Sequence, residues 1–305
     1  MLGYPMAITR LEQMLAAVQA RPRKRMAVAF GNDAHTLEAV HGAVARGIVE
    51  ATLVGDQAVI TARCAELGLD PAGFTILHEP VDTRATAQAV ALVRDGECQL
   101  LMKGLVSTDK YMRAILHKET GLMAPGAILS HVAVIEPVRY PKLLVCGDVA
   151  VIPYPELKEK LAILGYCAGV ARALGTARPR VAVLAASEQV LPRMQATVDA
   201  AILAKMAQRG QIQDCWVDGP MALDVAIDRE CAETKGVAGE VAGDADCLVF
   251  PNIDAGNVFY KACTKLAGCE LAAMVVGARV PCVLSSRGDS VLTKLYSITL
   301  AALTA

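Results

Sequence analysis

Asp95-Gly-Glu-Cys-Gln-Leu-Leu-Met-Lys-Gly104 is the stretch that best indicates how this chain folds. An acidic turn leads into an apolar strand that carries a cysteine, and a polar loop then leads into a helix that is expected to begin near Thr108. The same plan returns in Gly243-Asp-Ala-Asp-Cys-Leu-Val-Phe-Pro-Asn252. This echo indicates two related halves, each with one such loop, although so short a likeness also arises by chance.

Strand and helix patterns alternate over almost the whole chain. Short apolar runs, such as Met26–Phe30 and Val181–Leu184, are separated by amphipathic segments of helical length. Such βαβ alternation predicts largely parallel sheets with right-handed crossovers. With 305 residues, the chain is long enough for two ordinary domains. We therefore expect an α/β fold with two doubly wound domains, the first formed by 1–145 and the helix 288–305, the second by 146–287.

Composition and charge argue against several classes of function. The formal net charge is −1, so no strong field attracts nucleic acid or an anionic membrane. No apolar run reaches the ~18 residues of a membrane span, and the N-terminus lacks a signal-peptide pattern. None of the ten cysteines falls in a C-x-x-C pair, and Cys98, Cys146, Cys247 and Cys282 are expected in the core as reduced thiols. A cytoplasmic protein without nucleic-acid or membrane partners is expected.

Lys103-Gly-Leu-Val-Ser-Thr-Asp-Lys-Tyr-Met-Arg113 is a candidate phosphate site. A strand ends at Lys103, and Ser107 or Thr108 is expected to cap the helix that follows. Free amides at a helix N-terminus bind anions, and the adjacent lysine adds positive charge. Arg113, one to two turns further on, offers a planar fork that suits phosphate. An ordinary capped helix with solvated charges fits the same spacing equally well.

Pro251-Asn-Ile-Asp-Ala-Gly-Asn-Val-Phe-Tyr-Lys261 is a second candidate, because open parallel sheets bind ligands beyond the carboxyl ends of their strands. A loop is expected here, with a helix that begins after Asn257. Gly256 would let the backbone approach a ligand, and Asn252 and Asn257 offer neutral hydrogen bonds. On these residues alone, a tight loop with a permissive backbone is slightly favoured.

Ser285-Ser-Arg-Gly-Asp-Ser290 gathers hydroxyls, a guanidinium and a carboxylate between a strand and the final helix. A turn held by an Asp–Arg ion pair would look similar, but the concentration of donors favours function. Ser130, beside His131, is a further candidate ligand contact, whereas the histidine is more typical of a protein core. Gly31-Asn-Asp lacks the G-x-G-x-x-G pattern, so no nicotinamide cofactor is expected. No spacing of Asp, Glu and His predicts a metal site.

Six stretches in a fixed order carry a family resemblance. They are Leu101-Met-Lys-Gly-Leu-Val-Ser-Thr, Ile128-Leu-Ser-His-Val-Ala-Val, Asp218-Gly-Pro-Met-Ala-Leu-Asp224, Glu240-Val-Ala-Gly-Asp-Ala-Asp, Pro251-Asn-Ile-Asp-Ala-Gly-Asn-Val and Ser286-Arg-Gly-Asp-Ser. Together they resemble the phosphate acetyltransferase and phosphate butyryltransferase family, most closely its butyryltransferase branch. The resemblance covers nearly the whole chain, and the ordered set is far more specific than any of its members.

The resemblance implies two α/β domains of isocitrate dehydrogenase-like architecture with an active-site cleft between them. Members of the family commonly form dimers through the second domain, so a homo-oligomer is expected. The implied substrates are acyl-CoA and inorganic phosphate, which give acyl phosphate and coenzyme A in a ternary complex. The implied reaction uses no metal, no other cofactor and no covalent acyl-enzyme.

The resemblance also assigns residues. The catalytic Ser-Arg pair falls on Ser286 and Arg287, and the helix arginine near the substrate anion falls on Arg113. The aspartate that the acetyltransferase branch carries several residues past the pair, proposed to deprotonate the CoA thiol, is replaced by Thr293-Lys294. Asp289 is the candidate substitute. Ser286 is expected to donate a hydrogen bond, because no histidine base lies in its motif.

Two alternatives remain open at this stage. An acyl-carrier-protein:phosphate acyltransferase shares the general architecture and the phosphate chemistry. A non-catalytic CoA-binding regulatory protein on the same scaffold belongs to another class, and the complete set of Lys103, Arg113, Ser286 and Arg287 argues against it. A metal-dependent hydroxyacid dehydrogenase is disfavoured, because the expected aspartate cluster is absent from the sequence.

Overall fold

The structure, a computed structural model, describes residues 7–284 and 289–305, and packing divides the chain into two compact units. The flanking unit comprises 12–129 and 272–305, and the mid-chain unit comprises 130–271 together with the N-terminal segment up to Leu11. The domain boundary predicted at 145 and 146 stays a prediction, because close packing does not test which segments fold on their own.

The flanking unit contains a mostly parallel sheet in the strand order β3-β2-β1-β4-β11-β10. β3, β2, β1, β4 and β11 run parallel to one another, whereas β10 is antiparallel to β11. Its strands are β1 (Lys24–Ala29), β2 (Val49–Gly55), β3 (Thr75–His78), β4 (Leu100–Lys103), β10 (Glu270–Val276) and β11 (Cys282–Val283).

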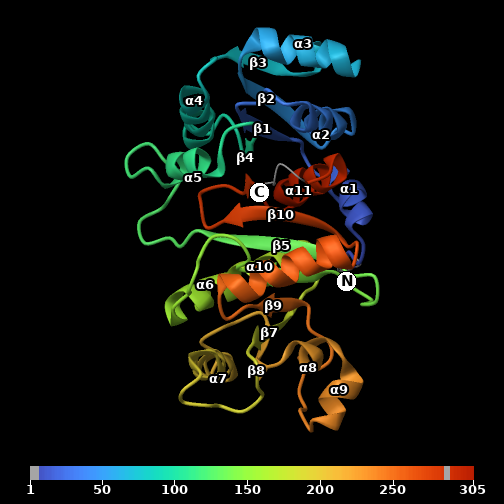
Figure 1. Cartoon of the computed structure of the whole chain (residues 1–305), viewed down its shortest axis with the longest axis vertical. Helices are drawn as coiled ribbons and strands as arrows, with labels where there is room; N and C mark the ends of the chain where they lie inside the picture. The colour runs from blue at the N-terminus through green and yellow to red at the C-terminus, as the bar shows by residue number, and fades with distance from the viewer. Residues whose placement is uncertain (1–6, 285–288) are drawn as a thin grey trace. The chain divides into compact units, whose positions relative to one another are not determined.

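Helices cover this sheet on both faces (Figure 1). α4 packs against β1, β2 and β4 and beside α5, while α2 packs beside α11, which contacts β4 and β11. The last helix therefore packs with elements of the N-terminal half. The helices are α1 (Leu11–Gln19), α2 (Ala34–Ala45), α3 (Gln57–Leu67), α4 (Asp82–Arg94), α5 (Thr108–Leu116) and α11 (Val291–Thr304), with a 3-10 turn at Pro71–Gly73.

The mid-chain unit contains strands in the order β5-β6-β9-β7-β8. β5 and β6 form an antiparallel pair, and the other pairs are parallel. The strands are β5 (Ser130–Glu136), β6 (Leu144–Gly147), β7 (Arg180–Leu184), β8 (Trp216–Met221) and β9 (Cys247–Val249). The helices are α6 (Leu157–Ala173), α7 (Gln195–Gln208), α8 (Leu223–Ile227), α9 (Arg229–Thr234) and α10 (Ile253–Lys261), which a π-helical turn at Ala262–Leu266 extends.

Buried apolar side chains fill the strands that are covered on both faces, as in β1, β4 and β9. Cys98, Cys146, Cys247 and Cys282 are buried as free thiols, which confirms their predicted place in the core. Over the described residues, no helix is both long and apolar enough to cross a membrane. The predicted α/β fold with largely parallel sheets is confirmed.

Glu156 is the N-cap of α6, and its backbone N–H donates to the Glu159 carboxylate over 2.7 Å. One predicted helix start is wrong. The stretch expected as a loop up to Asn257 is mostly helical, because α10 begins at Ile253 with Asn252 as its N-cap. The side-chain oxygen of Asn252 accepts a hydrogen bond from the Ala255 N–H over 3.0 Å, and this local cap outweighs the turn-like composition.

Candidate functional site

In the flanking unit, the carboxyl ends of three strands meet at one edge of the sheet. The register pairs Ala29 of β1 with Lys103 of β4, and Met102 of β4 with Val283 of β11. The turns that follow β1 and β4 are joined as well, since the Leu105 N–H donates to the Phe30 carbonyl over 2.8 Å. Lys103 therefore lies at the centre of this edge, where open α/β sheets bind their ligands.

The turn after β1 lies very close to the turn after β4, where Gly104 meets Phe30. Phe30 adopts a left-handed conformation with φ of 58°, which is uncommon for a residue with a side chain. A Cβ on Gly104 would lie 2.4 Å from the Phe30 carbonyl oxygen, so only glycine fits there. Backbone strain of this kind is concentrated at functional sites.

Lys103, at the end of β4, and the start of α5 are the residues for which the sequence predicts an anion site, and that role stays a prediction. Lys103 is only 5% exposed, and its Nζ donates to the Gly104 carbonyl over 3.2 Å. Ser107 is the N-cap of α5 and accepts a hydrogen bond from the Lys110 N–H, so Thr108 is the first helical residue rather than the cap. A buried ammonium beside a helix N-terminus attracts phosphate through both charge and backbone amides.

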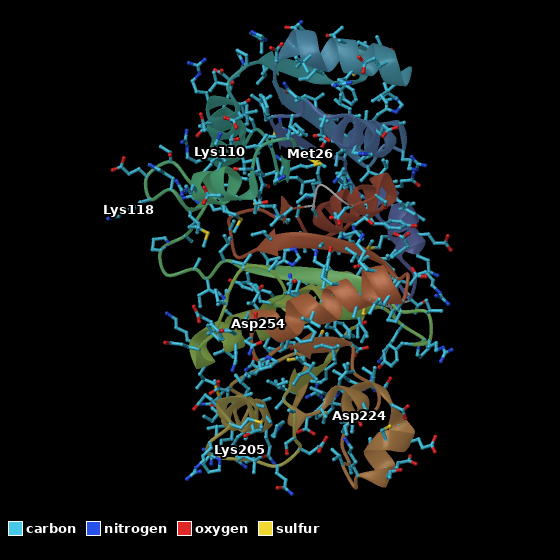
Figure 2. All side chains as sticks on the ribbon, in the orientation of Figure 1. Met26, Lys110, Lys118, Lys205, Asp224 and Asp254 are labelled. Atoms are coloured by element: carbon cyan, nitrogen blue, oxygen red, sulfur yellow. The ribbon has the colours of Figure 1, made fainter. Side chains whose placement is uncertain are left out.

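Arg113 lies on the outer surface of α5 instead of beside Lys103. Its side chain is 79% exposed, and its Nε is 3.1 Å from Oδ1 of Asp109, one turn earlier. Lys110, on the same helix, extends toward α4 (Figure 2), where its Nζ is 2.6 Å from Oδ2 of Asp82. This contact holds the pKa of Asp82 below its usual range. In this structure, both cations of α5 serve surface ion pairs.

The start of α11 lies at the same edge of the sheet and carries a further buried lysine, Lys294. Ser290 caps the helix by accepting a hydrogen bond from the Thr293 N–H over 3.0 Å. Lys294, in the first turn, is only 4% exposed, and burial lowers the pKa of its amine while the carboxylates of Asp289 and Asp33 oppose that change. The predicted catalytic pair Ser286 and Arg287 lies outside the described residues.

In the sequence, Lys294 stands out only as part of Thr293-Lys294, which replaces the aspartate of the acetyltransferase branch. Lys294 is the fourth residue of the helix that follows the Ser-Arg motif, and this place is visible in the sequence. A first-turn side chain on the helix after a strand end lies near the sheet's carboxyl edge.

Acidic residues after β1 and β2 serve as helix caps. Asp33 caps α2 by accepting from the Thr36 N–H, and Asp56 caps α3 by accepting from the Ala58 and Val59 N–H groups. Asp56 therefore has a local structural reason for its position.

In the mid-chain unit, a buried carboxylate organises the turn after β6. Asp148 is 2% exposed, and its side chain accepts hydrogen bonds from the Ser130 hydroxyl over 2.8 Å and from four backbone N–H groups. These amides belong to His131, Ala150, Val151 and Ile152. Ser130 is fully buried and its hydroxyl donates to Asp148, and its predicted contact with a ligand stays a prediction.

Helix α10 packs on this turn. The Asn257 side-chain amide donates to the Val149 carbonyl over 3.0 Å. A Cβ on Gly256 would lie 2.4 Å from the Asp148 carbonyl oxygen and 3.2 Å from Cα of Val149. Gly256 therefore lies close to the backbone of this turn, and its predicted approach to a ligand stays a prediction. Figure 2 marks the same helix at Asp254.

A separate cavity of about 530 Å³ lies in the mid-chain unit. The turn between β5 and β6 contributes Val138 and Tyr140, and the end of α10 contributes Phe259 and Cys263. None of the predicted site residues lines this cavity. Across the described chain, no three His, Cys, Asp or Glu side chains gather as metal ligands would.

The predicted residues thus fall into two groups. Lys103, Ser107 and Thr108 lie at the edge of the flanking sheet, in the same unit as Asp289. Ser130, Asn252, Gly256 and Asn257 surround the turn at Asp148 and Val149 or cap the helix packed on it. Fold and residues together define an α/β protein whose mostly parallel sheet carries a buried lysine, Lys103, and a capped helix start at one edge.

Comparison with known proteins identifies the family. The family model described as "Phosphate acetyl/butaryl transferase" matches residues 10–87 and 75–302, so the chain belongs to this family. This confirms the resemblance carried by the six motifs. The chain is 45% identical over 298 residues to a phosphate butyryltransferase from Clostridium acetobutylicum, with 98% of this chain and 99% of the relative covered.

Two further relatives agree. The chain is 40% identical over 292 residues to a phosphate acetyltransferase from Thermotoga maritima, with 96% of this chain and 98% of the relative covered. It is similar to the crystal structure of a branched-chain phosphotransacylase from Enterococcus faecalis, with a TM-score of 0.80 and 29% identity. That match covers 92% of this chain and 98% of the other.

Proposed function

We propose that this protein transfers a short acyl group between coenzyme A and inorganic phosphate. The observation that carries the proposal is full-length membership of a family whose relatives are named phosphate butyryltransferase and phosphate acetyltransferase. The buried lysine at the flanking sheet edge, beside the N-terminus of α5, supports the phosphate half of the reaction. An acyl-carrier-protein donor is disfavoured by these relatives.

Phosphate chemistry fits the groups present. By analogy with phosphomonoesters, phosphate has a second pKa of roughly 6–7, so its dianion attacks a thioester carbonyl carbon near neutral pH without a strong base. Lys103 and the α5 amides bind the anion, and Arg287 offers a bidentate contact to its oxygens. Ser286 donates a hydrogen bond to the tetrahedral oxyanion. In this proposal acyl transfer is direct, with both substrates bound and no acyl-enzyme.

The acyl group is proposed to be butyryl in preference to acetyl, because the butyryltransferase of C. acetobutylicum is more similar to this chain than the T. maritima acetyltransferase. Two extra methylenes in an apolar pocket contribute on the order of 1–3 kcal/mol to discrimination. We further propose a cytoplasmic homo-oligomer, of which a dimer is the simplest form, that needs no metal ion or other cofactor.

The test is phosphate-dependent release of the CoA thiol, measured with acetyl-, propionyl-, butyryl- and long-chain acyl-CoA. The proposal expects turnover that requires phosphate, with the highest kcat/KM for butyryl-CoA. Tight CoA binding without turnover would instead favour the regulatory alternative. A clear preference for acetyl-CoA would contradict the chain-length part alone.

A further inference from the structure

Two partly exposed cysteines, Cys263 and Cys269, lie at the end of α10, and the proposed reaction uses neither of them. Both line the cavity of about 530 Å³ in the mid-chain unit, together with Phe259 of α10 and Val138 of the turn between β5 and β6. Cys231 is also partly exposed, and the other seven cysteines are buried. Small reagents in solution therefore reach the sulfurs of Cys263 and Cys269 more readily than those of the core.

The way in which α10 ends brings these two cysteines together. The helix widens into the π-helical turn Ala262–Leu266, which a backbone hydrogen bond of 3.0 Å closes. Gly268 then adopts a left-handed conformation with φ of 65°, and it turns the chain back as the glycine after many helices does. As a result, the Cys269 N–H donates to the Cys263 carbonyl over 2.9 Å.

The separation of the two residues suits a disulfide bond. Disulfides join residues whose Cα atoms lie roughly 4.4–6.8 Å apart, and residues joined directly by a main-chain hydrogen bond lie within about that range. Their side chains interact as well, because the pKa of Cys263 is raised to about 11, first by burial and then by the neighbouring Cys269 thiol. The two sulfurs thus lie in one turn, within reach of each other.

The raised pKa of Cys263 determines how stable such a disulfide would be. A dithiol whose thiolate is stabilised stays reduced readily, whereas a dithiol whose thiolate is disfavoured gives a more stable disulfide. Burial disfavours the Cys263 thiolate in this way. We therefore expect a disulfide that forms slowly and that, once formed, resists weak reductants.

A buried cysteine near this turn is a poor competitor. Cys146 of β6 lies close enough to Cys263 for the charges of the two groups to interact. Its side chain is 0% exposed, and burial raises the pKa of its thiol well above the usual value. Cys146 therefore stays protonated and shielded from reagents, while Cys269 lies in the same turn as Cys263.

We propose that Cys263 and Cys269 form a modification site, which small-molecule disulfides convert into an intramolecular disulfide bond. The thiolate of one cysteine attacks a sulfur of the small disulfide, which gives a mixed disulfide and releases one half of the reagent as a thiolate. The second cysteine loses its proton, attacks the protein sulfur of the mixed disulfide and releases the other half. Two protein thiols lose two electrons, one small disulfide gains them, and the two protons pass to the released thiolates.

Trypsin gives a direct test, because Lys265 lies between the two cysteines. The folded, reduced protein is incubated with hydroxyethyl disulfide and then unfolded at acidic pH with N-ethylmaleimide, which blocks the remaining thiols before they exchange. Tryptic peptides are identified by mass spectrometry without reduction. The peptides 262–265 and 266–279 should appear joined, and dithiothreitol should separate them.

Cys269→Ser is the matched variant, in which Cys263 should stop at the mixed disulfide with the reagent. Cys231, a partly exposed thiol on α9, is the internal control and should join no other peptide. Should the variant fail to fold, the unmodified chain alone decides.

Three results with the folded, unmodified chain would overturn the proposal. They are mixed disulfides at Cys263 or Cys269 without joined peptides, two unmodified thiols at these positions, and a bond from Cys263 to Cys146. The readout is covalent mass and does not involve acyl transfer. Failure of this proposal is therefore distinct from failure of the proposed function.

Discussion

Gly256→Ala probes the packing of α10 against the turn at Asp148. The new methyl group would lie 2.4 Å from the Asp148 carbonyl oxygen, whereas real Cβ atoms essentially never come closer than 3.0 Å. The obstacle is backbone, and a second backbone atom, Cα of Val149, lies 3.2 Å away. The helix must therefore move outward by at least the difference, 3.0 − 2.4 = 0.6 Å.

The size of the effect follows from three contributions. Overpacking a tight contact costs about 1–3 kcal/mol. The shift also weakens the 3.0 Å hydrogen bond from Asn257 to the Val149 carbonyl, which contributes about 1 kcal/mol. Replacing glycine within a helix returns about 1 kcal/mol through propensity. We expect the free energy of unfolding to fall by about 1–3 kcal/mol, the sum of these contributions.

The assay is urea unfolding followed by circular dichroism, with Gly165→Ala as the control. Gly165 lies inside α6, is exposed, and has nothing within 4 Å of an added Cβ. Its substitution should raise the free energy of unfolding by up to about 1 kcal/mol. If Gly256→Ala proves as stable as Gly165→Ala, α10 does not pack on the Asp148 turn as described.

Three further predictions test the site and the chemistry. Ser130→Ala should lower the free energy of unfolding by about 1–3 kcal/mol, because the buried Asp148 carboxylate loses its hydroxyl donor; an unchanged value in thermal melting would contradict that hydrogen bond. Arg287→Ala should lower kcat by orders of magnitude with CoA binding retained, and Arg287→Lys should recover only part, since a point charge does not reproduce a bidentate fork. If the role of Arg287 is only to hold its turn, the melting temperature falls instead and kcat is unchanged in the folded fraction. Exhaustive chelation at matched ionic strength should leave turnover intact, and activity restored by one divalent ion alone would reveal a required metal.

The sequence was most informative where local pattern and fold agree. Strand β4 and helix α5 follow from the apolar run before Lys103 and the Ser107 cap, because both signals are contained within a dozen residues. The start of α10 was missed, since Asn, Asp and Gly favour turns as well as caps. Gly256 of the same helix also contacts a turn more than a hundred residues earlier, and this contact cannot be read from the sequence.

Polar contacts between residues that are distant in the sequence could not be predicted from the sequence pattern either. Ser130 and Asp148 are 18 positions apart, and only the pairing of β5 with β6 brings their oxygens together. Lys294 resembles any polar residue in a helical first turn until the packing of α11 on α2 removes it from water. Hydroxyls and amines acquire their roles from burial, and burial depends on the tertiary fold.

The central claim is that phosphate, and not water, accepts the acyl group. The most direct measurement mixes the protein with butyryl-CoA and phosphate and follows the free thiol optically and butyryl phosphate by phosphorus NMR. The account predicts one butyryl phosphate for each thiol released and no release without phosphate. Thiol release at the same rate without phosphate, or without any butyryl phosphate, would contradict it.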